Sequence, residues 1–454
     1  MAMQVERTTQ PSQPASQVAS ITPVLSARRV PDIVAAPVAD RRLAARLTAF
    51  LGQAPGPTCL VVEADGHQVF AEQPTTPMTP ASLLKLITGA AAIDKLGADT
   101  RLRTEARAGA PVAGGVVAGD LYLVGGGDPL LMTADYFAAL KHPPPERSSL
   151  EALADAVVAA GVRSVNGNVV GDESRYDGVR YNPHWAPGIA AGVSIGPMTA
   201  LTLNGGLDEY PPSPDLRRPA PHPADDPAAM AADRFATLLR ERGVTIGGTA
   251  VRAVTPPGSV ELAHLDSAPV SALVQEMLRE SDNATAELLA KEMGVRAAAS
   301  GTTDAGLAVL NQEIATRGLP ADGATIVDGS GLSTDNKVTC AVVQDLLDQE
   351  GPTGALASGL PVAAQTGTLE KRFNSQPVAG RLRAKTGSLN QVTALAGFLA
   401  TAGGSGVTFT YMLNLQRPQL ITNDDIALQD QLAAILDTYP EAPEIAILGP
   451  KPLP

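Results

Sequence analysis

Three short polar motifs lie far apart in this chain, and the distances between them limit how it can fold. The serine of Ser281-Asp282-Asn283 lies 199 residues after the serine of Ser82-Leu83-Leu84-Lys85, and the lysine of Lys385-Thr386-Gly387 lies 104 residues after Ser281. If the motifs form one site, the first gap must hold a domain of its own that leaves the outer segments free to meet.

The segment before the gap has strong secondary-structure signals. Leucines recur at helical spacing over 37–51 and predict an amphipathic helix. Apolar runs at 58–63 and 67–70 flank Asp65-Gly66, a pattern typical of a β-hairpin. Thr79-Pro80 reads as the start of a helix that runs to residue 96, with Gly97 as its stop.

Residues 104–265 have a different texture, because short apolar runs alternate there with glycine-rich turns. This pattern predicts a β-rich insert with helices near 150–160 and 228–242. The proline-rich stretch 211–228 reads as a solvated loop.

After the insert the helical pattern resumes, and the chain ends in strands. We expect helices at 269–280, 284–293, 303–317 and 336–349, strands at 391–400 and 407–415, and a closing helix at 424–438. Lys385-Thr386-Gly387 should begin or end a further strand. The order predicts an α+β fold in which both chain ends build one antiparallel sheet beside a helical lobe. We divide the chain into a leader (1–36), a discontinuous main domain (37–103 and 266–454) and the insert (104–265).

Composition excludes some classes of protein. A net charge of −13 argues against nucleic-acid binding, and no apolar run is long enough to span a membrane. Residues 1–25 are polar and lack the apolar core of a signal peptide, so we expect a disordered leader or a chain from which an export segment was removed. Cys59 and Cys340 have no metal-site spacing; we expect two buried thiols, with a disulfide as the alternative.

The first motif can supply a nucleophile. Residues three apart lie on one face of a helix, so the Ser82 hydroxyl and the Lys85 amine can meet. Ser82 would lie in the first turn, where backbone N–H groups stabilise an oxyanion. The amine acts as a base only when it is neutral, and burial or a neighbouring cation such as Lys385 lowers the pKa of a lysine.

The other two motifs can complete such a site. Ser281 can relay a proton and Asn283 can hold both Lys85 and a substrate carbonyl. The alternative is that Asp282 or Asn283 only caps the start of a helix. Lys385 and Thr386 can bind an anionic group, Gly387 lets a substrate backbone approach, and the N–H of Ser388 can join that of Ser82 as an oxyanion donor. Each tripeptide alone is also common in ordinary helices and strand ends.

Together, the three ordered motifs resemble those of the serine penicillin-recognising enzymes. The long first gap, GDLYLVGGGDP at 119–129, DGSGLS at 328–333, GTLEKRF at 367–373 and KTGSL at 385–389 resemble the class C low-molecular-mass penicillin-binding proteins, which are D-alanyl-D-alanine carboxypeptidases and endopeptidases. Thr334 departs from the arginine that many relatives carry after DGSGLS.

The resemblance implies a transpeptidase-like domain with a β-rich insert, no cofactor and no metal. It implies Ser82 as the acylated nucleophile, Lys85 as base, Ser281 as relay, Asn283 as orienter and Lys385 as anion binder, with Thr386, Gly387 and Ser388 binding substrate. The expected partners are peptidoglycan stem peptides and β-lactams, outside the cytoplasm. A β-lactamase and a catalytically silent cell-wall scaffold are the alternatives.

Overall fold

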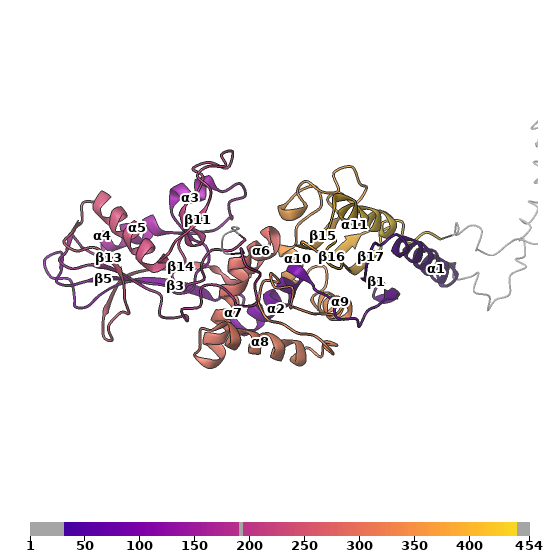
Figure 1. Cartoon of the computed structure of the whole chain (residues 1–454), viewed down its shortest axis with the longest axis horizontal. Coiled ribbons are helices and arrows are strands. Elements are labelled where there is room, and N and C mark those ends of the chain that lie inside the picture. The colour runs from indigo at the N-terminus through magenta and orange to yellow at the C-terminus, as the bar shows by residue number, and fades with distance from the viewer. Residues whose placement is uncertain (1–30, 190–193, 443–454) are drawn as a thin grey trace, which may run out of the picture.

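The computed structural model describes residues 31–189 and 194–442, which form a sheet-containing end, a central helical lobe and a separate insert (Figure 1). The predicted polar leader over 1–25 lies outside the described residues. No helix in the described part of the chain is long and apolar enough to cross a membrane.

Both chain ends build one five-stranded antiparallel sheet, as predicted. Its strand order is β15-β16-β17-β1-β2, which leaves β15 as an edge strand. The strands are β1 (Thr58–Ala64), β2 (His67–Glu72), β15 (Leu382–Leu389), β16 (Val392–Ala400) and β17 (Gly406–Asn414).

Alternating side chains of this sheet enter two different cores. Cys59 and Val61 of β1 pack with the helical lobe, whereas Leu60 and Val62 pack against the outer helices. These outer helices are α1 (Pro31–Leu51), which begins earlier than predicted, and α11 (Asn423–Leu436). The sheet is therefore buried on both faces, which explains its near-continuous apolar strands.

Helices pack against the inner face of the sheet and form the lobe (Figure 1). They are α2 (Leu84–Leu96), preceded by the 3-10 turn η2 (Ala81–Leu83), α6 (Val270–Glu280), α7 (Asn283–Ala298), α8 (Thr303–Thr316), α9 (Cys340–Glu350) and α10 (Ala355–Gly359). The 3-10 turn η4 (Gly367–Leu369) belongs to the other core, because Leu369 packs with the outer helices. Cys59 and Cys340 form a disulfide between β1 and α9, so our expectation of two buried thiols was wrong. Burial alone favours neither state; the folded chain brings the two Cα atoms within 6.1 Å.

The insert has its own sheet, in the order β13-β9-β5-β3-β14, with parallel pairing on the β13 side and antiparallel pairing on the β14 side. Its strands are β3 (Arg101–Ala108), β5 (Leu121–Val124), β9 (Val169–Asp172), β13 (Ala250–Arg252) and β14 (Val260–Pro269). The helices α4 (Leu150–Ala159) and α5 (Pro227–Glu241) cover it with a separate core.

Smaller elements complete the insert. They are β4 (Val116–Val117), β6 (Leu131–Met132), α3 (Ala134–Ala139), β7 (Ser148–Ser149), β8 (Ser164–Val165), the 3-10 turn η3 (Asn204–Gly206), β10 (Leu207–Glu209), β11 (His222–Pro223) and β12 (Thr245–Ile246). The insert is thus a mixed α/β unit with many short strands. The boundaries 1–36, 37–103 with 266–454, and 104–265 remain our proposal for the domains.

Candidate active site

Ser82 and Lys85 meet at the start of the central helix α2. Ser82 lies in the 3-10 turn η2 rather than in the first α-helical turn that we predicted, and Lys85 lies in the first turn of α2. The Lys85 Nζ donates a hydrogen bond to Ser82 Oγ at 3.0 Å. The tighter turn still leaves the two side chains on one side, so the first motif forms the predicted pair.

Lys85 is fully buried and is held by two further acceptors. Its Nζ donates to Asn283 Oδ1 at 2.7 Å and to the Ser330 carbonyl at 2.6 Å. Burial lowers the pKa of Lys85 to about 8, although the nearby carboxylates, Asp328 first, oppose the shift. The charges of Lys85 and Lys385 repel each other, so the neighbouring cation that we expected beside Lys85 is present.

Ser281 and Lys385 form a second pair. Ser281 ends α6 in a left-handed conformation (φ 59°), which turns its side chain away from the helix. The Lys385 Nζ donates to Ser281 Oγ at 2.8 Å and to the Thr386 carbonyl at 2.9 Å. Burial and the charge of Lys85 hold the pKa of Lys385 well below its usual range. Two positive charges close together in the protein interior cost free energy, so a charged Lys85 disfavours the charged form of Lys385.

Lys385 lies in the middle of edge strand β15 and not at a strand end, as we had expected. The Ala384 N–H donates to Pro361 on the outer edge, so the N–H groups two and four residues later, on Thr386 and Ser388, face that same open edge. Gly387 lies against the turn that carries Ser82, because a Cβ there would come within 2.8 Å of the Pro80 carbonyl oxygen. The absence of a side chain allows this approach.

Two buried carboxylates that sequence reasoning missed, Asp328 and Glu287, hold the loop whose carbonyl contacts Lys85. Asp328 accepts hydrogen bonds from the N–H groups of Gly331 and Ser333, and Glu287 accepts from the N–H groups of Gly329 and Ser330. This fixes the carbonyl that receives Lys85. The DGSGLS string pointed to the loop, but nothing in the sequence pointed to Glu287, which lies on the buried side of α7.

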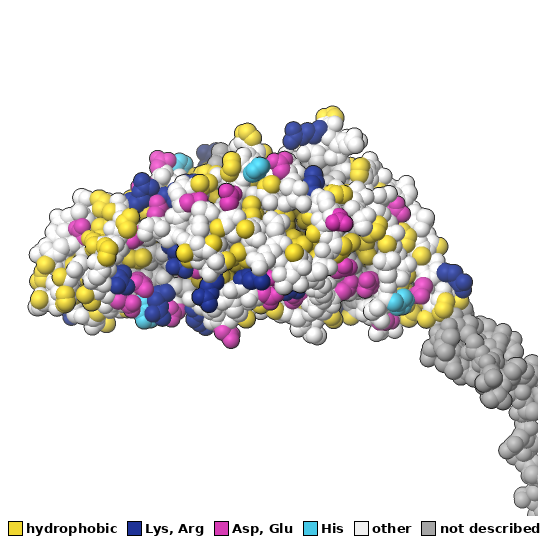
Figure 2. All heavy atoms as spheres, turned by 90° about the horizontal axis from the view of Figure 1, so that it is seen from below, with side chains coloured by type: hydrophobic (Ala, Val, Ile, Leu, Met, Phe, Trp, Pro, Cys, Tyr) yellow, Lys and Arg dark blue, Asp and Glu magenta, His cyan; other side chains and the backbone are white. Residues whose placement is uncertain are grey.

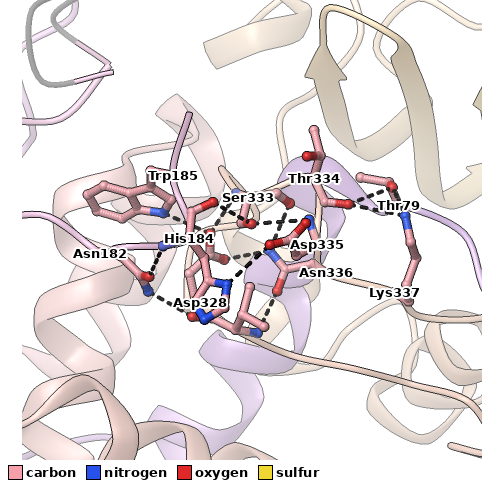
Figure 3. Close-up of polar contacts among 11 residues, drawn as sticks. Thr79, Asn182, His184, Trp185, Asp328, Ser333, Thr334, Asp335, Asn336 and Lys337 are labelled. Atoms are coloured by element: carbon pink, nitrogen blue, oxygen red, sulfur yellow. Dashed lines mark hydrogen bonds and ion pairs between the residues drawn. The ribbon is translucent and has the colours of Figure 1, made fainter. Parts of the chain in front are cut away.

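The loop of the insert that contains Trp185 packs against the loop that carries Asp328 (Figure 3). Trp185 Nε1 donates to Asp328 Oδ2 at 2.9 Å, and Asn182 Nδ2 donates to the Val327 carbonyl at 2.7 Å. At the other end of Figure 3, the Lys337 Nζ donates to the Thr334 carbonyl and to Thr79 Oγ1. Lys337 thus places an amine beside Thr334.

Two further contacts lie at the mouth of the site. Asn283 Nδ2 donates to the Ser194 carbonyl of the insert at 2.7 Å, so this amide bridges Lys85 and the insert. Thr386 Oγ1 donates to Thr368 Oγ1 at 2.9 Å, which gives the GTLEKRF string a place beside the third motif. No group of side chains suited to a metal ion occurs in the described residues.

An antiparallel sheet with a helical lobe, interrupted after helix α2 and carrying two Ser–Lys pairs with buried lysines, defines a transpeptidase-like fold. The D-Ala-D-Ala carboxypeptidase 3 (S13) family matches residues 50–214 and 201–439. The chain belongs to this family and is a serine-type D-Ala-D-Ala carboxypeptidase.

The chain is similar to proteins of known name that support this family assignment. The carboxypeptidase DacB of Mycolicibacterium smegmatis is 32% identical over 83% of this chain and 79% of its own. A D-alanyl-D-alanine carboxypeptidase of an Actinomadura species is 30% identical over 85% and 82%. Penicillin-binding protein 4 of Haemophilus influenzae has the same fold, with a TM-score of 0.72, 20% identity and coverage of 87% of this chain and 99% of the other.

Proposed function

We propose that this enzyme removes the terminal D-Ala of peptidoglycan stem peptides through an acyl-enzyme on Ser82. The observation that carries the proposal is the fully buried Lys85 amine, which contacts Ser82 Oγ at 3.0 Å and has a pKa lowered to about 8. A useful fraction of this lysine is neutral near physiological pH, which a general base requires.

Acylation follows from the contacts around Ser82. Neutral Lys85 takes the hydroxyl proton as Ser82 Oγ attacks the carbonyl carbon between the two D-Ala residues. The backbone N–H groups of Ser82 and Ser388 stabilise the oxyanion. Lys85 returns the proton to the leaving amine by way of Ser281, while Asn283 orients the lysine and the substrate. D-Ala leaves, and water then hydrolyses the ester.

The edge strand β15 supplies the substrate-binding surface. The outward N–H groups of Thr386 and Ser388 allow an extended peptide to add as a further strand, and Gly387 lies between them without a side chain. Lys385 binds the terminal carboxylate, and the approach of that anion raises the lowered pKa of Lys385 so that the ammonium form is present when substrate is bound.

The same serine should be trapped by β-lactams, and the working place of the enzyme is outside the cytoplasm. The disulfide between Cys59 and Cys340 supports an oxidising compartment. The penicillin-binding protein 4 of Haemophilus influenzae has also been solved with a β-lactam, with a TM-score of 0.65 to this chain, 20% identity and coverage of 87% of this chain and 99% of the other.

Two experiments test the proposal. Intact mass after incubation with a labelled penicillin should show one adduct, which Ser82→Ala abolishes and the exposed control Ser358→Ala retains. An adduct on the Ser82→Ala protein would refute the nucleophile. Release of D-Ala from a synthetic pentapeptide, run beside a cross-linked muropeptide, separates carboxypeptidase from endopeptidase activity.

The alternatives make different predictions for the same protein. A β-lactamase needs a base that activates the deacylating water, and Lys85 is the only hydrogen-bond partner of the Ser82 hydroxyl within the described residues. Penicillin should therefore be released slowly, and rapid turnover would favour a β-lactamase. A protein that neither binds penicillin nor releases D-Ala would be a silent scaffold.

A further inference from the structure

An open cavity of about 420 Å³ lies where the insert joins the helical lobe. Its lining includes four arginines, one of them on α7 and the others on β3 or in the insert, and two glutamates. These charged residues are Arg101, Arg103, Arg175, Arg296, Glu105 and Glu292.

The cavity is separate from the catalytic site. Leu96, the last residue of α2, lines it, whereas Ser82 lies just before the other end of this 13-residue helix. At 1.5 Å per residue, the helix separates the two places by about 20 Å. Arg296 lies in the last turn of α7, whose first residue is Asn283. The cavity and the active site thus occupy opposite ends of the same two helices.

The arginines of the cavity are not all neutralised. Arg175 pairs with the buried Glu292, and Arg103 pairs with Asp266 outside the lining. Arg101 donates only to the Ser267 carbonyl, at 2.6 Å, and neither it nor Arg296 has a carboxylate partner among the described residues. The lining therefore has two more positive than negative side chains, in a chain whose net charge is −13.

Arg101 and Arg296 are both exposed, so an anion that enters the cavity can reach their guanidinium groups. Figure 2 shows dark blue side chains on the lower face, in the part nearer the insert, with magenta side chains among them. Guanidinium groups bind phosphate oxygens in pairs of parallel hydrogen bonds, which favours arginine over lysine for this ligand. An excess of two charges matches a dianionic phosphate monoester better than a single carboxylate.

We propose that this cavity binds a phosphate group, with Arg101 and Arg296 as its primary contacts. The ligand is either a small phosphate compound or a phosphate borne on a polymer of the cell envelope. Binding at the root of the insert would anchor the enzyme beside its substrate without occupying the catalytic cleft. The proposal is independent of the role assigned to Ser82.

Calorimetric titration of the whole chain with inorganic phosphate and with glycerol 3-phosphate tests the site. We expect Arg101→Gln/Arg296→Gln to weaken binding at least about tenfold, which corresponds to the loss of one charge-assisted contact. Arg217→Gln/Arg240→Gln removes the same charge from exposed positions elsewhere and should bind as the parent does. Penicillin labelling should be unchanged in both double variants.

A single variant and a polymeric ligand separate the possible outcomes. Arg296→Gln alone changes only an exposed side chain, so a weakened affinity at an unchanged melting temperature supports the proposal even if the double variant is unstable. A poly(glycerol phosphate) that binds more tightly than glycerol 3-phosphate would identify a polymer as the source, and equal affinity would identify a small phosphate compound. Absence of phosphate binding by the parent, or equal binding by all variants, would overturn the proposal.

Discussion

The acylation rate should depend on pH through the buried amine of Lys85. Burial lowers its pKa from 10.5 to about 8, which corresponds to about 3 kcal/mol against the charged form. Because the pKa of Lys85 is about 8, its neutral, basic form becomes the majority form as pH rises through that value. About a tenth of Lys85 is then neutral at pH 7 and about nine-tenths at pH 9. The rate constant of penicillin labelling should rise about tenfold over this range.

Stopped-flow labelling with a fluorescent penicillin measures this dependence, and variants assign it. Lys85→Arg keeps the charge but holds its proton, so labelling should fall by about 10²–10⁴-fold and lose the rise. Lys385→Gln should slow labelling but keep a rise with pH, because Lys85 remains in place as the base. A flat profile in the parent, or a rise that persists in Lys85→Arg, would refute the reasoning.

Three structural contacts give further predictions. Gly387→Ala should slow penicillin labelling severalfold and destabilise the fold by about 1–3 kcal/mol, because its Cβ would come within 2.8 Å of the Pro80 carbonyl oxygen; unchanged labelling would contradict the close packing. Replacing both Cys59 and Cys340 by alanine should lower the free energy of unfolding in urea by about 2–5 kcal/mol. Trp185→Phe removes a donor to a buried carboxylate and should cost about 1.5–3 kcal/mol, with Tyr181→Phe nearby as a control that stays close to the parent.

Much of the fold could be predicted from the sequence, because its signals are local. Leucine periodicity placed α1, Asp65-Gly66 placed the β1–β2 hairpin, and glycine-rich turns marked the insert. The start of α2 was wrong, since Thr79-Pro80 resembles a helix cap while tertiary packing imposes a 3-10 turn first. The position of Lys385 within β15 was also wrong, because a strand that is buried on one side and open on the other shows no break at a functional residue.

The site itself was only partly accessible to sequence reasoning. The motifs name the residues that carry distinctive chemistry, and the structure brings Ser82, Lys85, Asn283, Ser281 and Lys385 into two hydrogen-bonded groups. The groups that hold these residues in place act through backbone atoms or are buried, and such groups do not form a short sequence motif. The carbonyl that holds Lys85 belongs to Ser330 of the DGSGLS string, but the glutamate that fixes this loop, Glu287, lies on a helix with no motif.

The long gap between the first two motifs is resolved by the way in which the insert joins the lobe. The insert begins with β3 and ends with β14, and these strands pair so that Arg101 lies opposite Pro269. The Val270 N–H donates to the Thr100 carbonyl at 2.9 Å, which closes the root of the insert. The chain therefore leaves and rejoins the lobe at one place.

From that root, two helices of similar length lead back to the active site. α2 has 13 residues and α6 has 11, so they span about 20 and 16 Å, and they pack side by side. Ser82 lies just before one helix and Ser281 just after the other. Strand pairing inside the insert, and not the contacts of the active site, offsets the conformational entropy lost when the ends of the 199-residue separation come together. An insert whose β3–β14 pairing is loosened should thus perturb both serines together, although neither serine belongs to it.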